Sequence, residues 1–197
     1  MFGVHVPPLG DRTPSRPNRL LKAIACFFLR LRGWRFDGVI PNEPKVVFIF
    51  APHTTAWDLF WTMVAVFALE LRVSWMGADW VFKFPFMKAM GGVPIDRKKS
   101  TGVVEQYVDL YQGQDQCLIA LSPEGSRKKR VPWRSGFYHI AHGAGVPIGL
   151  LSPDYRQRLL ILGPHFLPSG DFEADMDAHI RPFYERYLDE YPDRFGM

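Results

Sequence analysis

The sequence predicts an α/β domain in which a central, mostly parallel or mixed sheet is flanked by helices, with an amphipathic helix at the N-terminus. Short apolar runs of strand length alternate along the chain with segments whose apolar residues recur at helical spacing. The length of 197 residues suits one domain with a core of its own. Neither an internal repeat nor a linker divides the chain, so we expect a single domain.

The N-terminal part of the chain is predicted to hold a flexible arm and then a helix. Residues 1–18 are polar and rich in proline and arginine, and residues 19–34 have helical periodicity. The apolar residues of this helix share one face: Leu20, Ile24, Phe27, Phe28, Leu31 and Trp34. Arg19, Lys22 and Arg30 gather on the opposite side. A cationic helix of this kind lies flat on anionic membranes, although a helix packed on its own domain is the alternative.

The remaining residues, 35–197, carry the alternating pattern. Five apolar runs are predicted as strands, at residues 45–50, 73–76, 117–121, 146–151 and 158–162. Five segments are predicted as helices, at residues 56–71, 79–90, 104–111, 136–142 and 172–190. We expect these helices to cover the faces of the sheet.

The net charge of +4 is unevenly distributed along the chain. Residues 1–45 carry eight Lys and Arg against three acids, whereas residues 168–197 carry eight acids against three Arg. Two further basic runs lie at residues 97–99 and 127–130. Such clusters attract anionic lipid surfaces, phosphate ligands or nucleic acid, and charge alone does not distinguish among the three.

Cysteine usage and apolar run length bear on the cellular compartment. Cys26 and Cys117 lie far apart in apolar runs, which predicts reduced core thiols. A membrane-spanning helix needs about 20 mainly apolar residues, and the best candidate is cut short by Lys22 and Arg30. The polar residues 1–18 are unlike a cleavable signal peptide. We therefore expect a soluble or peripheral protein.

A histidine and an aspartate stand where the predicted strand 45–50 gives way to the next helix, as His53-Thr-Thr-Ala-Trp-Asp58. A histidine takes up a proton near neutral pH, and a nearby carboxylate orients it and stabilises its charged form. In the alternative interpretation, Thr54 or Thr55 caps the helix and His53 is incidental. No serine or cysteine lies in a nucleophile-elbow pattern, which favours direct attack by a substrate hydroxyl.

Three further segments combine turn residues with an arginine or lead into a strand. Residues 123–127 read Pro-Glu-Gly-Ser-Arg, and residues 91–97 read Gly-Gly-Val-Pro-Ile-Asp-Arg. The arginine at the end of each offers a planar fork for phosphate. Residues 145–148 read Gly-Val-Pro-Ile and begin a predicted strand. Taken singly, the three segments are also explained as a turn, a surface ion pair and a core strand.

Together the four segments resemble the blocks of the glycerolipid acyltransferase family, typified by bacterial 1-acylglycerol-3-phosphate acyltransferases. In this chain the blocks are His53…Asp58, Gly92…Arg97, Pro123…Arg127 and Val146…Ile148. The resemblance covers about residues 34–190, and the Pro-Glu-Gly-Ser-Arg turn is its most specific part.

The resemblance implies a role for each block. His53 is the general base on the acceptor hydroxyl, and Asp58 orients it. Arg97 binds the phosphate of the acceptor. The residues that shape the acceptor pocket are Glu124, Gly125, Ser126 and Arg127. The residues that support the acyl channel are Val146, Pro147 and Ile148. No metal or redox cofactor is implied.

The implied reaction moves a fatty acyl group from acyl-CoA or acyl carrier protein to the hydroxyl of a lysophospholipid such as 1-acylglycerol-3-phosphate. Residues 35–197 form the acyltransferase domain, and the protein is expected to be peripheral at the cytoplasmic face of the inner membrane. The expected partners are the lipid surface, the acyl carrier and the lysolipid, with no nucleic acid. A lyso-aminolipid acceptor without phosphate and a non-catalytic membrane-binding homologue are the alternatives. Ala78 stands where many relatives carry a lysine.

Overall fold

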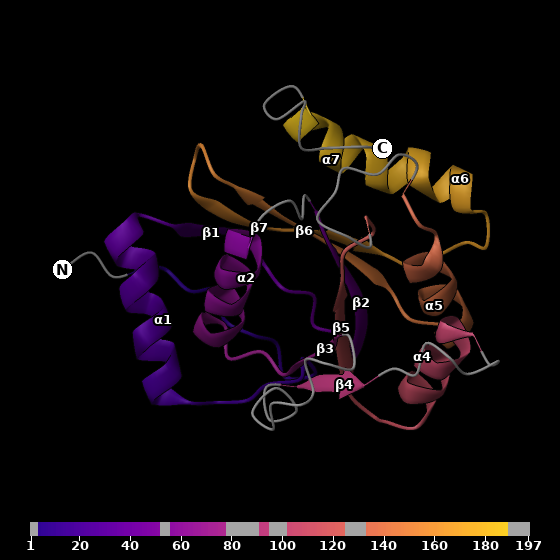
Figure 1. Cartoon of the computed structure of the whole chain (residues 1–197), viewed down its shortest axis with the longest axis horizontal. Helices are drawn as coiled ribbons and strands as arrows, with labels where there is room; N and C mark the ends of the chain where they lie inside the picture. Colours follow the sequence, from indigo (N-terminus) through magenta and orange to yellow (C-terminus); the bar gives the residue numbers. More distant parts are fainter. Residues whose placement is uncertain (1–3, 52–55, 78–90, 95–101, 125–132, 189–197) are drawn as a thin grey trace.

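Seven strands of the described residues form one mixed sheet in the order β1-β7-β6-β2-β5-β3-β4 (Figure 1). The computed structural model describes residues 4–51, 56–77, 91–94, 102–124 and 133–188. The strands are β1 (Arg35–Gly38), β2 (Lys45–Phe50), β3 (Val73–Gly77), β4 (Gly92–Pro94), β5 (Cys117–Leu121), β6 (Ile148–Asp154) and β7 (Leu159–Phe166). Every neighbouring pair is parallel except β6 and β7, which form an antiparallel hairpin.

Helices cover both faces of this sheet. They are α1 (Arg19–Arg32), α2 (Ala56–Ala68), α4 (Val103–Gln112), α5 (Gly136–Ala144), α6 (Phe172–Asp175), the π-helical turn η2 (Met176–Ile180) and α7 (Arg181–Leu188). Figure 1 shows α1 and α2 on one side of the strands and α4 to α7 on the other. The arrangement confirms the α/β fold class that the sequence predicts.

The alternation of side chains along β2 explains why buried clusters form on both faces of the sheet. Val47 and Ile49 are buried in the cluster under α4, α5 and α7. Val46 and Phe48 point to the opposite face, in the cluster that includes Leu69 just after α2. Successive residues of a strand face opposite sides of the sheet, so a central strand covered on both faces is apolar throughout.

Helix α1 has clear signals at both ends. The side chain of Asn18 accepts a hydrogen bond from the Leu21 N–H, and Gly33 ends the helix at a φ of 70°. Ala25 and Leu29 are buried against the domain. Trp34, which the sequence placed on the apolar face of the helix, lies beyond its end and is buried, with its ring stacked on Trp61 at 4.6 Å.

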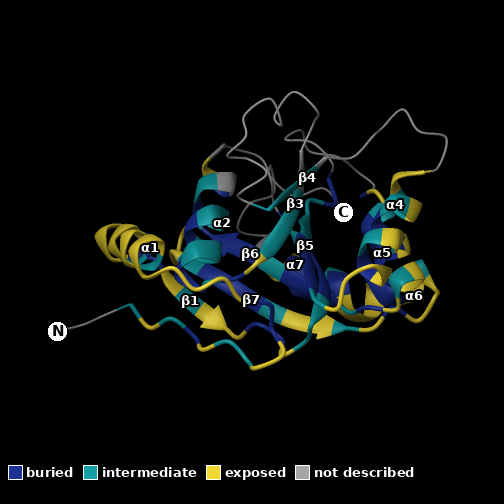
Figure 2. Cartoon of the chain, turned by 90° about the horizontal axis from the view of Figure 1, so that it is seen from below, coloured by how far each residue is buried: buried dark blue, intermediate teal, exposed yellow. Residues whose placement is uncertain are grey.

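The large apolar residues predicted to share one face of α1 are exposed in the structure. Their exposed fractions are 69% for Leu20, 45% for Ile24, 61% for Phe27, 36% for Phe28 and 63% for Leu31. Figure 2 shows α1 as a largely exposed helix at the side of the domain. Helix α1 therefore packs through a narrow stripe and leaves its larger apolar side chains uncovered by the described residues.

Residues 4–18 make specific contacts along the edge of the domain. The Thr13 hydroxyl donates to the Pro41 carbonyl at 3.0 Å, and the Arg16 N–H donates to the Glu70 carbonyl at 2.7 Å. Ser15 also forms an antiparallel bridge with Leu71. These contacts join residues 13–16 to the domain, and the flexibility of residues 1–18 stays a prediction.

The predicted elements and the structure agree closely where both are described, apart from shifted ends and two short strands. The strand expected at 146–151 begins at Ile148, and that expected at 158–162 extends to Phe166. Strands β1 and β4 were not predicted. The helix predicted at 79–90 lies outside the described residues. None of the described helices has the length and apolar character needed to cross a membrane.

Candidate active site

The predicted motifs follow strands that are neighbours in the sheet. Strands β2, β5, β3 and β4 are adjacent and parallel, so their carboxyl ends reach the same edge. His53 comes three residues after Phe50, and Glu124 three residues after Leu121. Arg97 comes three residues after Pro94. The carboxyl edge of a parallel sheet is where α/β proteins bind ligands, so the ends of these strands mark the candidate site.

Several motif residues lie outside the described part of the chain: His53, Ala78, Arg97, Gly125, Ser126 and Arg127. Asp58 and Glu124 are described, and the structure buries both completely. A buried carboxylate is costly unless hydrogen bonds or charges compensate it, so two such groups after neighbouring strands make this edge of the sheet a candidate functional region.

Asp58 lies in the first turn of α2, where the positive end of the helix dipole favours a carboxylate. The Tyr155 hydroxyl donates a hydrogen bond to Asp58 Oδ1. A hydrogen bond to a charged group contributes about 1.5–3 kcal/mol. Tyr155 therefore fixes one side of the carboxylate that the sequence pairs with His53.

Tyr155 is itself held by aromatic neighbours. Its ring packs edge-on against Trp34 at 5.3 Å, and Trp34 stacks on Trp61 of α2. Edge-to-face aromatic pairs contribute about 0.5–1.5 kcal/mol beyond the area they bury. This packing limits where the Tyr155 hydroxyl lies relative to Asp58.

Glu124 follows β5 in the turn that the sequence predicted. The Arg134 N–H donates to the Pro123 carbonyl at 3.0 Å, which ties the beginning of this turn to the segment before α5. Glu124 is thus a buried carboxylate three residues after the end of β5.

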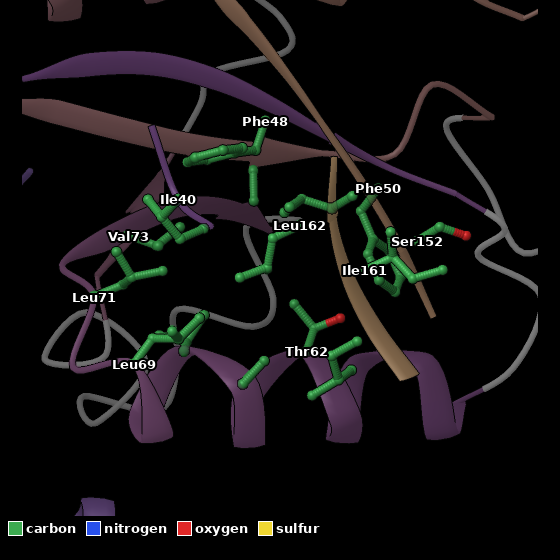
Figure 3. Close-up of a pocket in the computed structure, with 15 residues that line it drawn as sticks. Ile40, Phe48, Phe50, Thr62, Leu69, Leu71, Val73, Ser152, Ile161 and Leu162 are labelled. Atoms are coloured by element: carbon green, nitrogen blue, oxygen red, sulfur yellow. The ribbon is translucent and has the colours of Figure 1, made fainter. Parts of the chain in front are cut away.

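An apolar cavity lies between α2 and the sheet (Figure 3). It measures about 50 Å³. The lining residues are Ile40, Phe48, Phe50, Thr62, Ala65, Val66, Leu69, Leu71, Val73, Ala120, Leu151, Ser152, Leu160, Ile161 and Leu162. Figure 3 shows Thr62 of α2 and Leu69, just after this helix, facing strand residues such as Leu162 across the cavity. Thr62 and Asp58 are joined within α2, since the Thr62 hydroxyl donates to the Asp58 carbonyl at 2.7 Å.

Residues 35–149, more than half of the chain, match the family model described as Acyltransferase. The chain belongs to this family. The crystal structure of the 1-acyl-sn-glycerophosphate (LPA) acyltransferase PlsC from Thermotoga maritima is also similar, with a TM-score of 0.64 and 15% sequence identity. The match covers 90% of this chain and 82% of that chain, and at this identity it shows a shared fold. No curated protein matches the chain.

The last block of the acyltransferase resemblance lies elsewhere in the sheet. Ile148 begins β6, which runs parallel to β2, so residues 146–148 are at the amino edge of the sheet. Val146 and Ile148 are buried in the core under α5, and the Pro147 carbonyl accepts a hydrogen bond from the Val47 N–H at 3.0 Å. These residues hold the start of β2 and do not line the cavity under α2. Their support of an acyl channel remains a prediction.

Sequence reasoning missed Tyr155. This residue is 97 positions from Asp58 and lies after β6, in the connection to β7. It is outside the segment that matches the acyltransferase family, and no motif spacing marks it. Only the antiparallel β6–β7 hairpin brings its hydroxyl to the start of α2.

Proposed function

We propose that this acyltransferase moves a fatty acyl group from acyl-CoA or acyl carrier protein to the hydroxyl of a lysophospholipid such as 1-acylglycerol-3-phosphate. The observation that carries the proposal is the fully buried, hydrogen-bonded Asp58, five residues after His53 and at the carboxyl edge of the sheet. The family membership and the order of the motifs along the chain support it.

In the proposed mechanism, His53 removes the proton from the acceptor hydroxyl as its oxygen attacks the thioester carbonyl. The tetrahedral intermediate collapses, the carbon–sulfur bond breaks, and the proton passes from His53 to the leaving thiolate. Asp58 holds the His53 tautomer and stabilises the imidazolium ion. Tyr155 already satisfies Asp58 Oδ1, so Oδ2 is the oxygen we assign to His53.

The turn after β5 and the arginine after β4 supply the acceptor site in this proposal. Arg97 and Arg127 bind the phosphate, because a guanidinium group matches a phosphate with paired hydrogen bonds. Glu124 and Ser126 shape the pocket, and backbone N–H groups near Gly125 stabilise the oxyanion. One such donor is worth about 3 kcal/mol in other acyl-transfer enzymes.

The cavity under α2 suits the hydrocarbon chain of an acyl group, since its lining is almost wholly apolar. Water occupies about 30 Å³ per molecule in the liquid, so a cavity of about 50 Å³ holds very little without adjustment. We infer that a bound chain separates the side chains of α2 from those of the sheet as it enters.

We also propose that the protein lies on the membrane that supplies its lysolipid, at the cytoplasmic face of the inner membrane. The exposed apolar face of α1 supports this, since Phe27 and Leu31 are both more than 60% exposed. Apolar side chains on one face of a basic helix bind the boundary between headgroups and acyl chains.

The experiment is transfer of a labelled acyl group to a panel of lysolipids, from acyl-CoA and from acyl carrier protein separately. The wild-type protein should acylate lysophosphatidic acid, and His53→Ala should lower the rate about 100-fold or more. Folding of the variant is checked by circular dichroism. Equal rates for wild type and a folded His53→Ala would refute the mechanism. Acylation of a lyso-aminolipid alone would refute the acceptor assignment.

A further inference from the structure

A second concavity, of about 480 Å³, opens at the surface beside Asp58 and is separate from the cavity under α2. Its lining residues are Leu31, Arg32, Trp34, Trp57, Trp61, Tyr155 and Arg158. They come from the end of α1 and the residue Trp34 just after it, from the first half of α2, and from the turn between β6 and β7. Five of the seven lie outside the family match at 35–149, and Trp57 and Trp61 lie within it.

Aromatic rings form a continuous strip from this concavity to the exposed face of α1. Trp57 is 60% exposed and packs edge-on against Phe60 at 5.8 Å. Phe60 packs in the same way against Phe28 of α1 at 5.7 Å. Tryptophan is favoured where one side of a surface is apolar and the other wet, as at the edge of a bilayer.

Two guanidinium groups accompany these rings. Arg158 Nη1 donates a hydrogen bond to the Arg32 carbonyl at 3.2 Å, which places Arg158 at the end of α1. Arg158 also has a φ of 55°, a conformation that costs free energy in a residue other than glycine. Within the described ranges, neither Arg32 nor Arg158 forms an ion pair with an acidic side chain. The concavity therefore carries positive charge that an anion would balance.

We propose that this concavity binds the phosphate of an anionic phospholipid in the bilayer on which α1 lies. The proposal rests on the membrane docking proposed above. Leu31 belongs both to the exposed apolar face of α1 and to the lining of the concavity, so a lipid held there has its acyl chains beside that face. Arginine forks bind phosphate in pairs of charge-assisted hydrogen bonds, and Trp57 borders the headgroup.

The docked lipid is distinct from the proposed acceptor. Arg97 and Arg127, the proposed acceptor ligands, follow β4 and β5, on one side of β2 in the strand order. The turn that carries Arg158 joins β6 and β7, on the other side of β2. The strands that precede the two proposed phosphate sites therefore lie on opposite sides of β2 in the sheet.

The test compares Arg32→Gln with Arg30→Gln in the full-length protein, by sedimentation with vesicles of phosphatidylcholine with and without phosphatidylglycerol. Both arginines lie in the last turn of α1, but only Arg32 lines the concavity. Loss of one basic residue near an anionic surface lowers affinity about fivefold through general attraction. Arg30→Gln should show that loss, whereas Arg32→Gln should lose about 50-fold, because hydrogen bonds to the phosphate go with the charge.

Equal losses for the two variants would overturn the proposal, since they would show general charge attraction only. A second measurement on the wild type needs no variant: vesicles with phosphatidylglycerol are compared with vesicles carrying the same negative charge as fatty acid. A protein with a phosphate site should bind the phosphatidylglycerol vesicles more tightly than the fatty-acid vesicles. Equal binding to the two kinds of vesicle contradicts the proposal. Displacement of the protein by inorganic phosphate at constant ionic strength would show a site for free phosphate instead of lipid. These readouts are independent of acyl transfer, so the lipid site and the proposed enzymatic activity fail separately.

Discussion

Replacing Tyr155 with phenylalanine removes one hydroxyl next to the carboxylate of the proposed catalytic pair and leaves the aromatic ring in place. The ring keeps its edge-on contact with Trp34, so the surrounding packing is preserved. What is lost is the hydrogen bond that Tyr155 donates to Asp58 Oδ1. Because Asp58 is fully buried, water does not freely replace the lost donor.

Two effects of different size follow. Loss of a hydrogen bond to a buried charged group should lower the free energy of unfolding by about 1.5–3 kcal/mol. In the proposed mechanism Asp58 also stabilises the imidazolium form of His53, which exists only as the reaction proceeds. A looser Asp58 should therefore lower kcat by about tenfold, equivalent to about 1.4 kcal/mol, and leave the KM of the acceptor nearly unchanged.

The matched control is Tyr111→Phe. The Tyr111 hydroxyl is also buried, but it donates to the Val46 carbonyl at 2.8 Å, near the amino end of β2 and away from the carboxyl edge. Its removal should cost about 1 kcal/mol of stability without changing kcat. Urea denaturation gives the stabilities, and steady-state acyl transfer gives kcat and KM. If Tyr155→Phe and Tyr111→Phe lower stability equally and neither changes kcat, Tyr155 does not act through Asp58.

Three further predictions concern the phosphate, the acyl chain and a buried thiol. Arg97→Lys should raise the KM for lysophosphatidic acid strongly and change the KM of the acyl donor little, because lysine lacks the paired hydrogen-bond donors of a guanidinium group. An unchanged KM for the acceptor would contradict the assignment of Arg97 to the phosphate. Ala120→Leu narrows the cavity under α2 and should shift the preference among acyl donors toward shorter acyl chains. The preference is measured as kcat/KM across a series of chain lengths. An unaltered preference would show that the acyl chain binds elsewhere. Burial raises the pKa of Cys117 to about 11, above the usual value of 9.0. As pH rises, the thiol of Cys117 loses its proton in the unfolded chain before it does so in the folded protein. The free energy of unfolding should therefore fall between about pH 9 and pH 11. Urea titrations should show a smaller fall for Cys117→Ala.

The parts of the fold that the sequence predicts well are those whose signals are local. The strand 45–50 is an uninterrupted apolar run, and the structure has β2 over Lys45–Phe50. Helix α1 begins at its predicted residue because Asn18 caps it. Its end differs because Gly33 adopts a left-handed conformation, which leaves Trp34 free to turn into the core. Glycine after a helix is itself a stop signal, so the end of α1 is also marked locally in the sequence.

Strand β1 shows what local signals miss. It reads Arg-Phe-Asp-Gly and is mostly exposed, because it lies at the edge of the sheet and pairs with β7 alone. An edge strand needs no apolar run, so neither alternation nor hydrophobicity reveals it. The antiparallel direction of β7 is likewise set by its pairing with β6 and not by its own residues.

The residues of the candidate site fall into two groups, on either side of β2 in the strand order. The sequence indicates one group and not the other. On the side of β5, β3 and β4, each loop carries residues whose chemistry and spacing the sequence makes visible, and the parallel sheet gathers those loops at one edge. On the side of β6 and β7, the turn supplies Tyr155 to Asp58 and Arg158 to the basic concavity, yet nothing in its residues indicates either contact. The first set is recognised because chemistry constrains which residues stand at the ends of the strands. The second set depends on the β6–β7 hairpin lying beside the start of α2. Contacts between segments so distant in the sequence can be identified only in the folded structure.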